Sequence, residues 1–246
     1  MMYLTPESES IEAAIKSGEN VKVFQSKKRV GLRKFPVFHG FEPTGDTNKA
    51  KGVGLILYPG AFVDPTQYSP FARSLAELGY HIAIVNFAFN FAITNFKRAE
   101  DVLKYKAWED IKCWAIAGHS VGGVMACAYA NDYTEKLKGV ALLASYPYDR
   151  KIFNGNLKGL GLKVSSIWGT KDGLTTEDHI EGSKSILPDS TKFVAIVGGN
   201  HTQYYYSETL QKKDNEADIT RDEQQIQIRK ATHELLDVRD MFSFVT

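Results

Sequence analysis

Short apolar runs alternate with amphipathic stretches from about residue 53 to the end of the chain. The runs are rich in β-branched residues, as in GVGLILYPG, which ends in a Pro-Gly break, and in YHIAIVNF. Continuous apolar runs of this length are typical of strands that are covered on both faces. The alternation therefore predicts an α/β fold with a mostly parallel, twisted sheet of about eight strands and helices on both faces.

The same pattern places the individual elements. An antiparallel edge hairpin is expected over residues 20–41, and later strands at 52–60, 80–87, 113–120, 137–147, 163–173 and 191–201. Helices are expected at 69–79, 93–106, 121–132, 175–187 and 221–241. Ser69 before Pro70 is a predicted N-cap, and Thr220 with Glu223 is a predicted capping box. The last helix should bury one stripe, formed by Ile228, Ala231, Leu235 and Val238.

No internal repeat or low-complexity tract divides the chain. We therefore expect a single domain over residues 1–246, with residues 1–19 as a peripheral N-terminal segment. The connection from Pro147 to Leu162 is too short to form a separate cap domain. An active site in this fold should then be open to solvent on that side.

Composition narrows the possible partners. The 246 residues include 30 basic and 29 acidic side chains, for a net charge of +1. This balance provides no bulk attraction to nucleic acid or to anionic membranes. The basic cluster at 27–34 is short and is interrupted by VGL, so we interpret it as a solvated strand edge and turn.

The cysteines and the N-terminal sequence bear on location. Cys113 and Cys127 are too few for the disulfide framework of a secreted domain, so both are expected to be free and structural, with one bridge between them as the alternative. The N-terminal sequence is polar and acidic, and no run approaches the ~20 apolar residues of a membrane span. We expect a soluble protein of the cytoplasm.

One segment carries the strongest chemical signal. The sequence GHSVG at 118–122 fits G-x-S-x-G between a predicted strand and a predicted helix, and in that setting it predicts a nucleophile elbow at Ser120. Gly118 and Gly122 supply the small residues that the close approach of strand and helix requires. The helix beginning at Val121 points its positive end at the site. A tight turn with an incidental serine is the alternative interpretation.

A serine hydroxyl needs a base to accept its proton. Three histidines follow Ser120 at a useful distance. His179 and His233 lie in predicted helices, where we expect them at the surface or in packing. His201 follows an apolar strand and a Gly-Gly-Asn loop, from which a base can reach over the elbow, so it is the predicted base. The side chain of His119 should point away from the serine Oγ and serve packing or orientation.

The acid that supports the base should lie between Ser120 and His201 in this fold. Asp172, followed by Gly173 on a loop that leaves a strand, is the predicted acid. Asp149, after the preceding strand, is its rival.

An oxyanion hole needs two backbone N–H groups. We expect one from Val121, directly after the nucleophile, and the other from Ala61 or Phe62, after the strand at 52–60.

The loop 86–91 follows a strand on the side where such sheets bind ligands. Its aromatic residues are expected either to wall a substrate pocket or to pack under the sheet, and the tyrosines after His201 present the same two alternatives. The predicted substrate-binding residues are Phe89, Asn90, Phe91 and Tyr204.

The sequence has no dinucleotide-binding glycine pattern, no Walker loop and no zinc-binding spacing, so neither a cofactor nor a metal is expected.

Taken together, these motifs make the chain similar to the α/β-hydrolase superfamily, and most similar to its small lidless branch, often called hydrolase family 5. The resemblance covers about residues 53–230 and rests, in order, on YPGAFVDPTQYSPFARSLAELGY, GHSVGG, IWGTKDGL and GGNHTQYY followed by ITRDEQQ. It implies a Ser-Asp-His triad at Ser120, Asp172 and His201 and activity on carboxylic esters.

Two departures from the family pattern affect the shape of the pocket. Ala61 stands where the family usually has a further glycine, and the segment after His201 is bulky and polar where the family is glycine-rich. Dienelactone hydrolases share the fold but use a cysteine nucleophile where this chain has Ser120.

The expected function is hydrolysis of a small-molecule carboxylic ester through an acyl-enzyme on Ser120. No nucleic-acid partner is expected. A thioesterase, lactonase or peptidase with the same triad remains an alternative, as does a non-catalytic binding protein of this fold.

Overall fold

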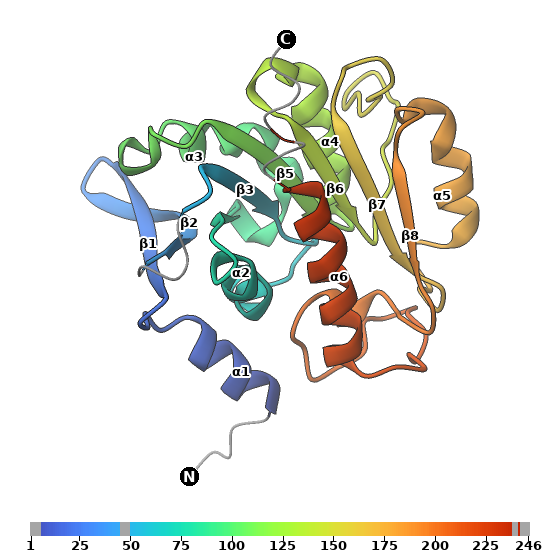
Figure 1. Cartoon of the computed structure of the whole chain (residues 1–246), viewed down its shortest axis with the longest axis horizontal. Coiled ribbons are helices and arrows are strands. Elements are labelled where there is room, and N and C mark those ends of the chain that lie inside the picture. Colours follow the sequence, from blue (N-terminus) through green and yellow to red (C-terminus); the bar gives the residue numbers. More distant parts are fainter. Residues whose placement is uncertain (1–5, 45–49, 238–240, 242–246) are drawn as a thin grey trace.

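One eight-stranded sheet runs through the centre of the protein (Figure 1). The structure is a computed structural model that describes residues 6–44, 50–237 and 241. The strand order is β1-β2-β4-β3-β5-β6-β7-β8. The strands are β1 (Val21–Val30), β2 (Arg33–Pro43), β3 (Val53–Tyr58), β4 (His81–Val85), β5 (Cys113–His119), β6 (Gly139–Leu143), β7 (Lys163–Gly169) and β8 (Lys192–Ile196).

The pairing confirms the predicted architecture. Strands β3 to β8 pair in parallel, whereas β1 and β2 form an antiparallel hairpin that joins β4 at the sheet edge. Every residue of β3 and β5 is buried, which explains why their sequences are continuously apolar. The carboxyl ends of the parallel strands share one edge, and the loops that follow them meet there.

Helices cover both faces of the sheet. On one face, α2 (Ser69–Ala76) and α6 (Arg221–Leu235) contribute to one apolar core, and in Figure 1 they lie in front of the strands. On the other face, α3 (Ala99–Leu103) and α4 (Val121–Asp132) contribute to a second core. A further helix, α5 (Glu177–Ser183), lies between β7 and β8 along the chain. The layers are those that the alternation of elements predicts.

The N-terminal segment contains a helix, α1 (Pro6–Ala14), that lies at the periphery of the molecule (Figure 1). It packs against α2, where Arg73 donates hydrogen bonds to the carbonyls of Ala14 and Lys16. Glu7 forms an ion pair with Arg221 at the start of α6, with 2.6 Å between Oε1 and Nη1. These contacts attach α1 to the helical layer outside the sheet.

The expected N-cap role of Ser69 is wrong. Helix α2 begins at Ser69 itself, and Ser69 Oγ has no hydrogen-bond partner within the described residues. A short 3₁₀ turn over Pro65–Tyr68 runs directly into α2, so the side-chain cap lies before this turn instead of directly before α2. Asp64 provides that cap, because its carboxylate accepts the backbone N–H of Thr66 at 2.8 Å.

The helix expected over 93–106 is also shorter than predicted. Only Ala99–Leu103 is α-helical, and 3₁₀ turns precede it. The hydroxyl of Tyr58 accepts the N–H of Ala99 at 2.9 Å and donates to the carbonyl of Phe96. Backbone groups that would continue an α-helix are therefore bonded to a side chain from β3.

The C-terminal helix agrees with its prediction over the residues that the structure describes. The capping box of Thr220 and Glu223 is present, and Ile228, Ala231 and Leu235 are buried. The expected stripe residue Val238 lies outside the described residues.

The connection over 147–162 contains no helix and only one isolated bridge, between Asp149 and Asn154, so no cap domain is inserted there. Within the described part of the chain, no helix is both long and apolar enough to cross a membrane.

Candidate active site

Ser120 occupies the turn between β5 and α4 in a strained backbone conformation, with φ 53° and ψ −127°. The strand and the helix approach closely on both sides of it. A Cβ atom on Gly118 would lie 2.3 Å from the carbonyl oxygen of Gly122, and one on Gly122 would lie 2.3 Å from the carbonyl oxygen of Tyr58. Only glycine fits at these two positions, so the local geometry is that of the predicted elbow.

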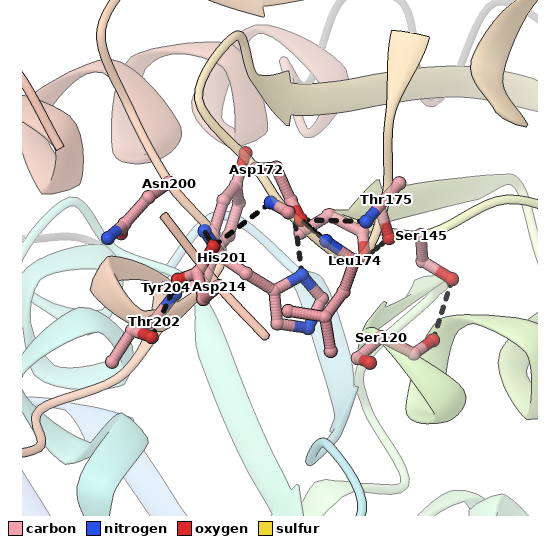
Figure 2. Close-up of polar contacts among 12 residues, drawn as sticks. Ser120, Ser145, Asp172, Leu174, Thr175, Asn200, His201, Thr202, Tyr204 and Asp214 are labelled. Carbon is pink, nitrogen blue, oxygen red and sulfur yellow. Dashed lines mark hydrogen bonds and ion pairs between the residues drawn. The ribbon is translucent and has the colours of Figure 1, made fainter. Parts of the chain in front are cut away.

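Asp172 and His201 meet at the carboxyl edge of the sheet, after β7 and β8 (Figure 2). His201 Nδ1 lies 2.8 Å from Asp172 Oδ2, and both side chains are fully buried. The other carboxylate oxygen of Asp172 accepts the backbone N–H groups of Leu174 at 2.8 Å and Thr175 at 2.7 Å. These bonds fix the carboxylate, which in turn places the imidazole proton on Nδ1 and leaves Nε2 as an acceptor.

The second ring nitrogen of His201 is available for proton transfer. Nε2 is buried and has no hydrogen-bond partner among the residues that the structure describes. In Figure 2 the Nε2 side of the ring is turned toward Ser120. Ser120 is partly exposed, and its carbonyl accepts a hydrogen bond from Ser145 Oγ at 2.7 Å. The arrangement provides an elbow serine and a histidine with an unpartnered ring nitrogen at the same edge of the sheet.

Asp214 is a functional candidate that the sequence analysis missed. Its Oδ1 accepts the backbone N–H of Gly173 at 3.1 Å and that of His201 at 3.2 Å. Its Oδ2 accepts the N–H and the hydroxyl of Thr202, each at 2.7 Å. One carboxylate thus holds the loop that follows Asp172 and the loop that contains His201 together (Figure 2). Asp214 lies in a polar loop without periodicity or motif, and no sequence signal marks it.

The base loop is also attached to α6. The backbone N–H of Asn200 donates to Gln224 Oε1 at 2.9 Å, and Gln224 Nε2 donates back to the carbonyl of Asn200 at 2.8 Å. Gln224 is fully buried. This reciprocal pair explains why a glutamine stands on the buried side of the first turns of α6, and it fixes the position from which His201 projects.

Asp149, the rival acid, lies apart from this cluster. Its side chain is exposed and accepts a long hydrogen bond from Asn156 Nδ2 at 3.4 Å. Among the described contacts, none joins Asp149 to His201. The geometry therefore favours Asp172 as the partner of the base.

The other two histidines have local partners of their own. His179 is exposed and completes the capping box of α5 with Thr176. His233, within α6, has its Nδ1 2.8 Å from the hydroxyl of the buried Tyr80. Neither is placed beside Ser120, as the sequence analysis expected.

The two alternatives for the second oxyanion donor differ in the structure. The N–H of Phe62 donates to the carbonyl of Asn90 at 2.8 Å, so it is already used and the prediction for Phe62 is wrong. The N–H of Ala61 makes no hydrogen bond within the described residues. Val121 begins α4, and the first N–H groups of a helix have no intrahelical partner. Ala61 and Val121 are the remaining candidates.

The loops after β3 and β4 are bound to each other and present aromatic rings to solvent. The rings of Phe62 and Phe91 stack with centroids 5.1 Å apart and an interplanar angle of 15°. Phe62 and Phe89 are 73% and 86% exposed, and both have positive φ, as does Asn90. Phe87 instead packs edge-on against Tyr58 in the core. Phe89, Asn90 and Phe91 therefore remain candidates for contact with a substrate.

The expected substrate contact of Tyr204 is wrong. Tyr204 is 2% exposed, its hydroxyl donates to the carbonyl of Ile167 at 3.0 Å, and its ring stacks on His119. Burial, and then the nearby charge of Asp172, raise the pKa of Tyr204 well above its usual range. Tyr204 is a core residue behind the site because the turn after His201 directs it inward.

The described residues contain no group of three or more His, Cys, Asp or Glu side chains that could hold a metal ion. Cys113 and Cys127 are free and buried, as predicted.

The sequence profile of the alpha/beta hydrolase family matches residues 54–226. This span exceeds half of the chain and contains Ser120, Asp172 and His201. The chain belongs to the alpha/beta hydrolase family. No curated protein sequence matches it.

Solved structures share the fold at low sequence identity. A Xanthomonas campestris protein described as an α/β serine hydrolase without a lid is 12% identical, with a TM-score of 0.61 over 90% of this chain and 97% of its own. A putative dienelactone hydrolase from Klebsiella pneumoniae is 13% identical, with a TM-score of 0.64 over 88% and 99%. An esterase domain from Rhodothermus marinus is 12% identical, with a TM-score of 0.61 over 85% and 95%. At these identities the similarity shows a shared fold and nothing further.

Proposed function

We propose that this hydrolase is a serine carboxylesterase in which Ser120 is the nucleophile, His201 the general base and Asp172 the supporting acid. The observation that carries the proposal is the buried Asp172–His201 pair, whose acceptor nitrogen Nε2 has no partner in the described structure, at the same sheet edge as an elbow serine. The similar solved structures that are described as an esterase domain and as a putative dienelactone hydrolase support cleavage of an ester or lactone bond.

The proposed reaction is acyl transfer to water. Ser120 Oγ gives its proton to His201 Nε2 and attacks the ester carbonyl carbon, whose oxygen becomes an oxyanion. The N–H groups of Ala61 and Val121 stabilise that oxyanion. The intermediate collapses to an acyl-enzyme, and His201 returns the proton to the leaving alcohol. A water molecule then repeats the sequence, which releases the acid and restores Ser120.

Electrostatics support these roles. The carboxylate of Asp172 faces the imidazolium that forms during the reaction, and it stays oriented because two backbone N–H groups hold its second oxygen. The N-terminus of α4, directly after Ser120, places the positive end of a helix dipole beside the oxyanion.

A hollow near the loop after β4 is a candidate for the part of a substrate that lies away from the reacting bond, although Ser120 and His201 are not among its lining residues. This hollow of about 460 Å³ lies where the β4 loop meets the start of β2, and Asn90, Phe87, Phe35 and Arg98 are among its lining residues. Asn90 bonds to Phe62, the neighbour of Ala61, so the hollow adjoins the proposed oxyanion loop. Together with the open connection over 147–162, this favours small to medium esters. The cytoplasmic location remains a prediction from the sequence.

The test is hydrolysis of p-nitrophenyl esters from acetate to octanoate by the native protein and by Ser120→Ala. We expect turnover by the native protein and a loss on the order of 10⁴-fold or more in the variant. Ser190→Ala, the same change at an exposed serine, is the matched control and should retain native activity.

Thioester and lactone substrates in the same assay distinguish the related activities. A fluorophosphonate probe that labels Ser120 reports the reactive nucleophile independently of substrate choice. If no substrate is hydrolysed and the probe leaves Ser120 unlabelled, the protein is not a serine hydrolase, and a ligand-binding role replaces the proposal.

A further inference from the structure

A single buried hydroxyl connects the two loops that carry the proposed oxyanion donors. Tyr68 lies at the junction of a 3₁₀ turn and α2 and is fully buried. Its Oη accepts the N–H of Gly60 at 2.9 Å and lies 2.8 Å from His119 Nδ1. Gly60 directly precedes Ala61, and His119 directly precedes the elbow serine. The Tyr68 hydroxyl therefore bridges the β3 loop and the elbow.

The direction of both hydrogen bonds follows from the atoms involved. The N–H of Gly60 can only donate, so the phenolic oxygen accepts it. The described residues offer the phenolic proton no acceptor other than His119 Nδ1, which favours a neutral His119 with its proton on Nε2, a buried nitrogen that has no partner among the described residues. Burial, followed by the neighbouring His201, lowers the pKa of His119 well below its usual range, and burial raises the pKa of Tyr68. Both shifts favour the neutral forms of the two groups, between which the hydrogen bond can form.

The packing around the bridge leaves no space for an alternative arrangement. A Cβ atom on Gly60 would lie 2.8 Å from His119 Nδ1 and 3.2 Å from Tyr68 Oη, so the bridge requires glycine there. The ring of His119 stacks on Tyr204 at 5.4 Å and 10°, and its centroid is 4.6 Å from that of His201. His119 is therefore held between the core and the proposed base.

We propose that Tyr68 and His119 are positioning residues: their hydrogen bond fixes the separation between the Ala61 and Val121 N–H groups and presents a neutral ring to His201. The inference rests on the proposed function. Two donors stabilise one oxyanion only when both lie within hydrogen-bond distance of the same point, so the spacing of their two loops sets transition-state binding. A neutral His119 adds no positive charge that would oppose formation of the His201 imidazolium.

Tyr68→Phe tests the inference by removing one oxygen and keeping the ring. We expect kcat for p-nitrophenyl butyrate to fall by about 10- to 100-fold, with KM changed less than about twofold. The affinity for a trifluoromethyl ketone, which forms a tetrahedral adduct with Ser120, should fall by a similar factor. Tyr205→Phe is the matched control, because Tyr205 is a buried neighbour whose hydroxyl bonds to Gln211 instead, and it should keep native kinetics.

A second pair of variants keeps the inference testable if Tyr68→Phe does not fold. His119→Asn offers an amide oxygen near the position of Nδ1 and should recover most of the activity that His119→Leu loses. In an active native enzyme, native kcat for Tyr68→Phe, or equal losses for His119→Asn and His119→Leu, would overturn the inference alone. A native protein that neither hydrolyses esters nor labels at Ser120 would overturn the proposed function and this inference with it.

Discussion

Two carboxylates make different contacts in the site, the buried Asp172 and the partly buried Asp214. Asp172 directs one oxygen at the His201 ring and the other at backbone N–H groups. Asp214 does not contact the ring and instead accepts hydrogen bonds from the backbone of both loops. A carboxylate removed from water is tolerated only when its oxygens are occupied in this way. Their different partners predict different kinetic consequences of mutation.

Asp172→Asn should lower kcat by roughly 10³- to 10⁴-fold, because an amide no longer holds the imidazole proton on Nδ1 or compensates the imidazolium. Steady-state hydrolysis of p-nitrophenyl butyrate measures this loss. Asp149→Asn, the same change at the rival position, should leave kcat unaffected. The opposite ranking of the two variants would assign the acid to the loop after β6.

Asp214→Ala should lower kcat by on the order of 10- to 100-fold, because the backbone of His201 loses its anchor and the base is misplaced. It should also lower the free energy of unfolding by about 1–3 kcal/mol, since buried N–H groups lose their acceptor. Kinetics and urea unfolding measure the two effects. Asp218→Ala, which removes an exposed carboxylate paired with Lys171, is the control. Equal behaviour of the two variants would exclude a positioning role for Asp214.

At the scale of elements, the site depends on how closely β5 approaches α4. Serine is aimed outward because the chain reverses from strand to helix within one residue, and glycines on both sides let the two backbones meet. The neighbouring carbonyl groups belong to backbone, which cannot rotate aside as a side chain can. Extra volume at this junction must therefore move a whole element.

Gly118→Ala should destabilise the fold by about 3 kcal/mol or more, because its Cβ would lie 2.3 Å from a backbone oxygen of α4. Gly182→Ala is the matched control: it lies inside α5, nothing lies within 4 Å of its Cβ, and the change should stabilise the protein by about 0.5–1 kcal/mol. Thermal unfolding followed by circular dichroism separates the two. A Gly118→Ala protein as stable as the control would show that the junction can relax.

For the molecule as a whole, several histidines are held in environments that disfavour their charged form. Burial lowers the pKa of His39, His81, His119 and His233. A lowered pKa in the folded state means that the unfolded chain binds protons first as the pH falls. The stabilising contribution is therefore complete above the usual histidine pKa of about 6.5 and is lost progressively below it.

We accordingly expect the free energy of unfolding to decrease between pH 7.5 and pH 5. The fully buried His119 alone contributes a slope of up to ~1.4 kcal/mol per pH unit in this range. Urea unfolding at several pH values measures the slope. His119→Asn removes the titrating ring and should make the dependence shallower, and an unchanged slope would contradict this assignment.

The sequence by itself determined the succession of strands along the chain, the mostly parallel sheet, the elbow at Ser120, and Asp172 and His201 as the best candidates for acid and base. These features can be predicted because hydrophobic periodicity and glycine spacing are local patterns in the sequence, and because the order of the motifs along the chain is given directly. The catalytic roles of Ser120, Asp172 and His201 remain a prediction that the geometry supports.

Only the tertiary structure decided which of several equivalent groups are placed where they could take part in the proposed reaction. It assigned the Phe62 N–H to Asn90, buried Tyr204, and brought Asp214 to Gly173 and Tyr68 to His119, which are far from them along the chain. A hydrogen bond between distant segments depends on the path of both backbones and on burial, and neither leaves a pattern in the intervening residues. That is why the candidates for nucleophile, acid and base could be predicted from the sequence, whereas the residues that hold their loops in place could not.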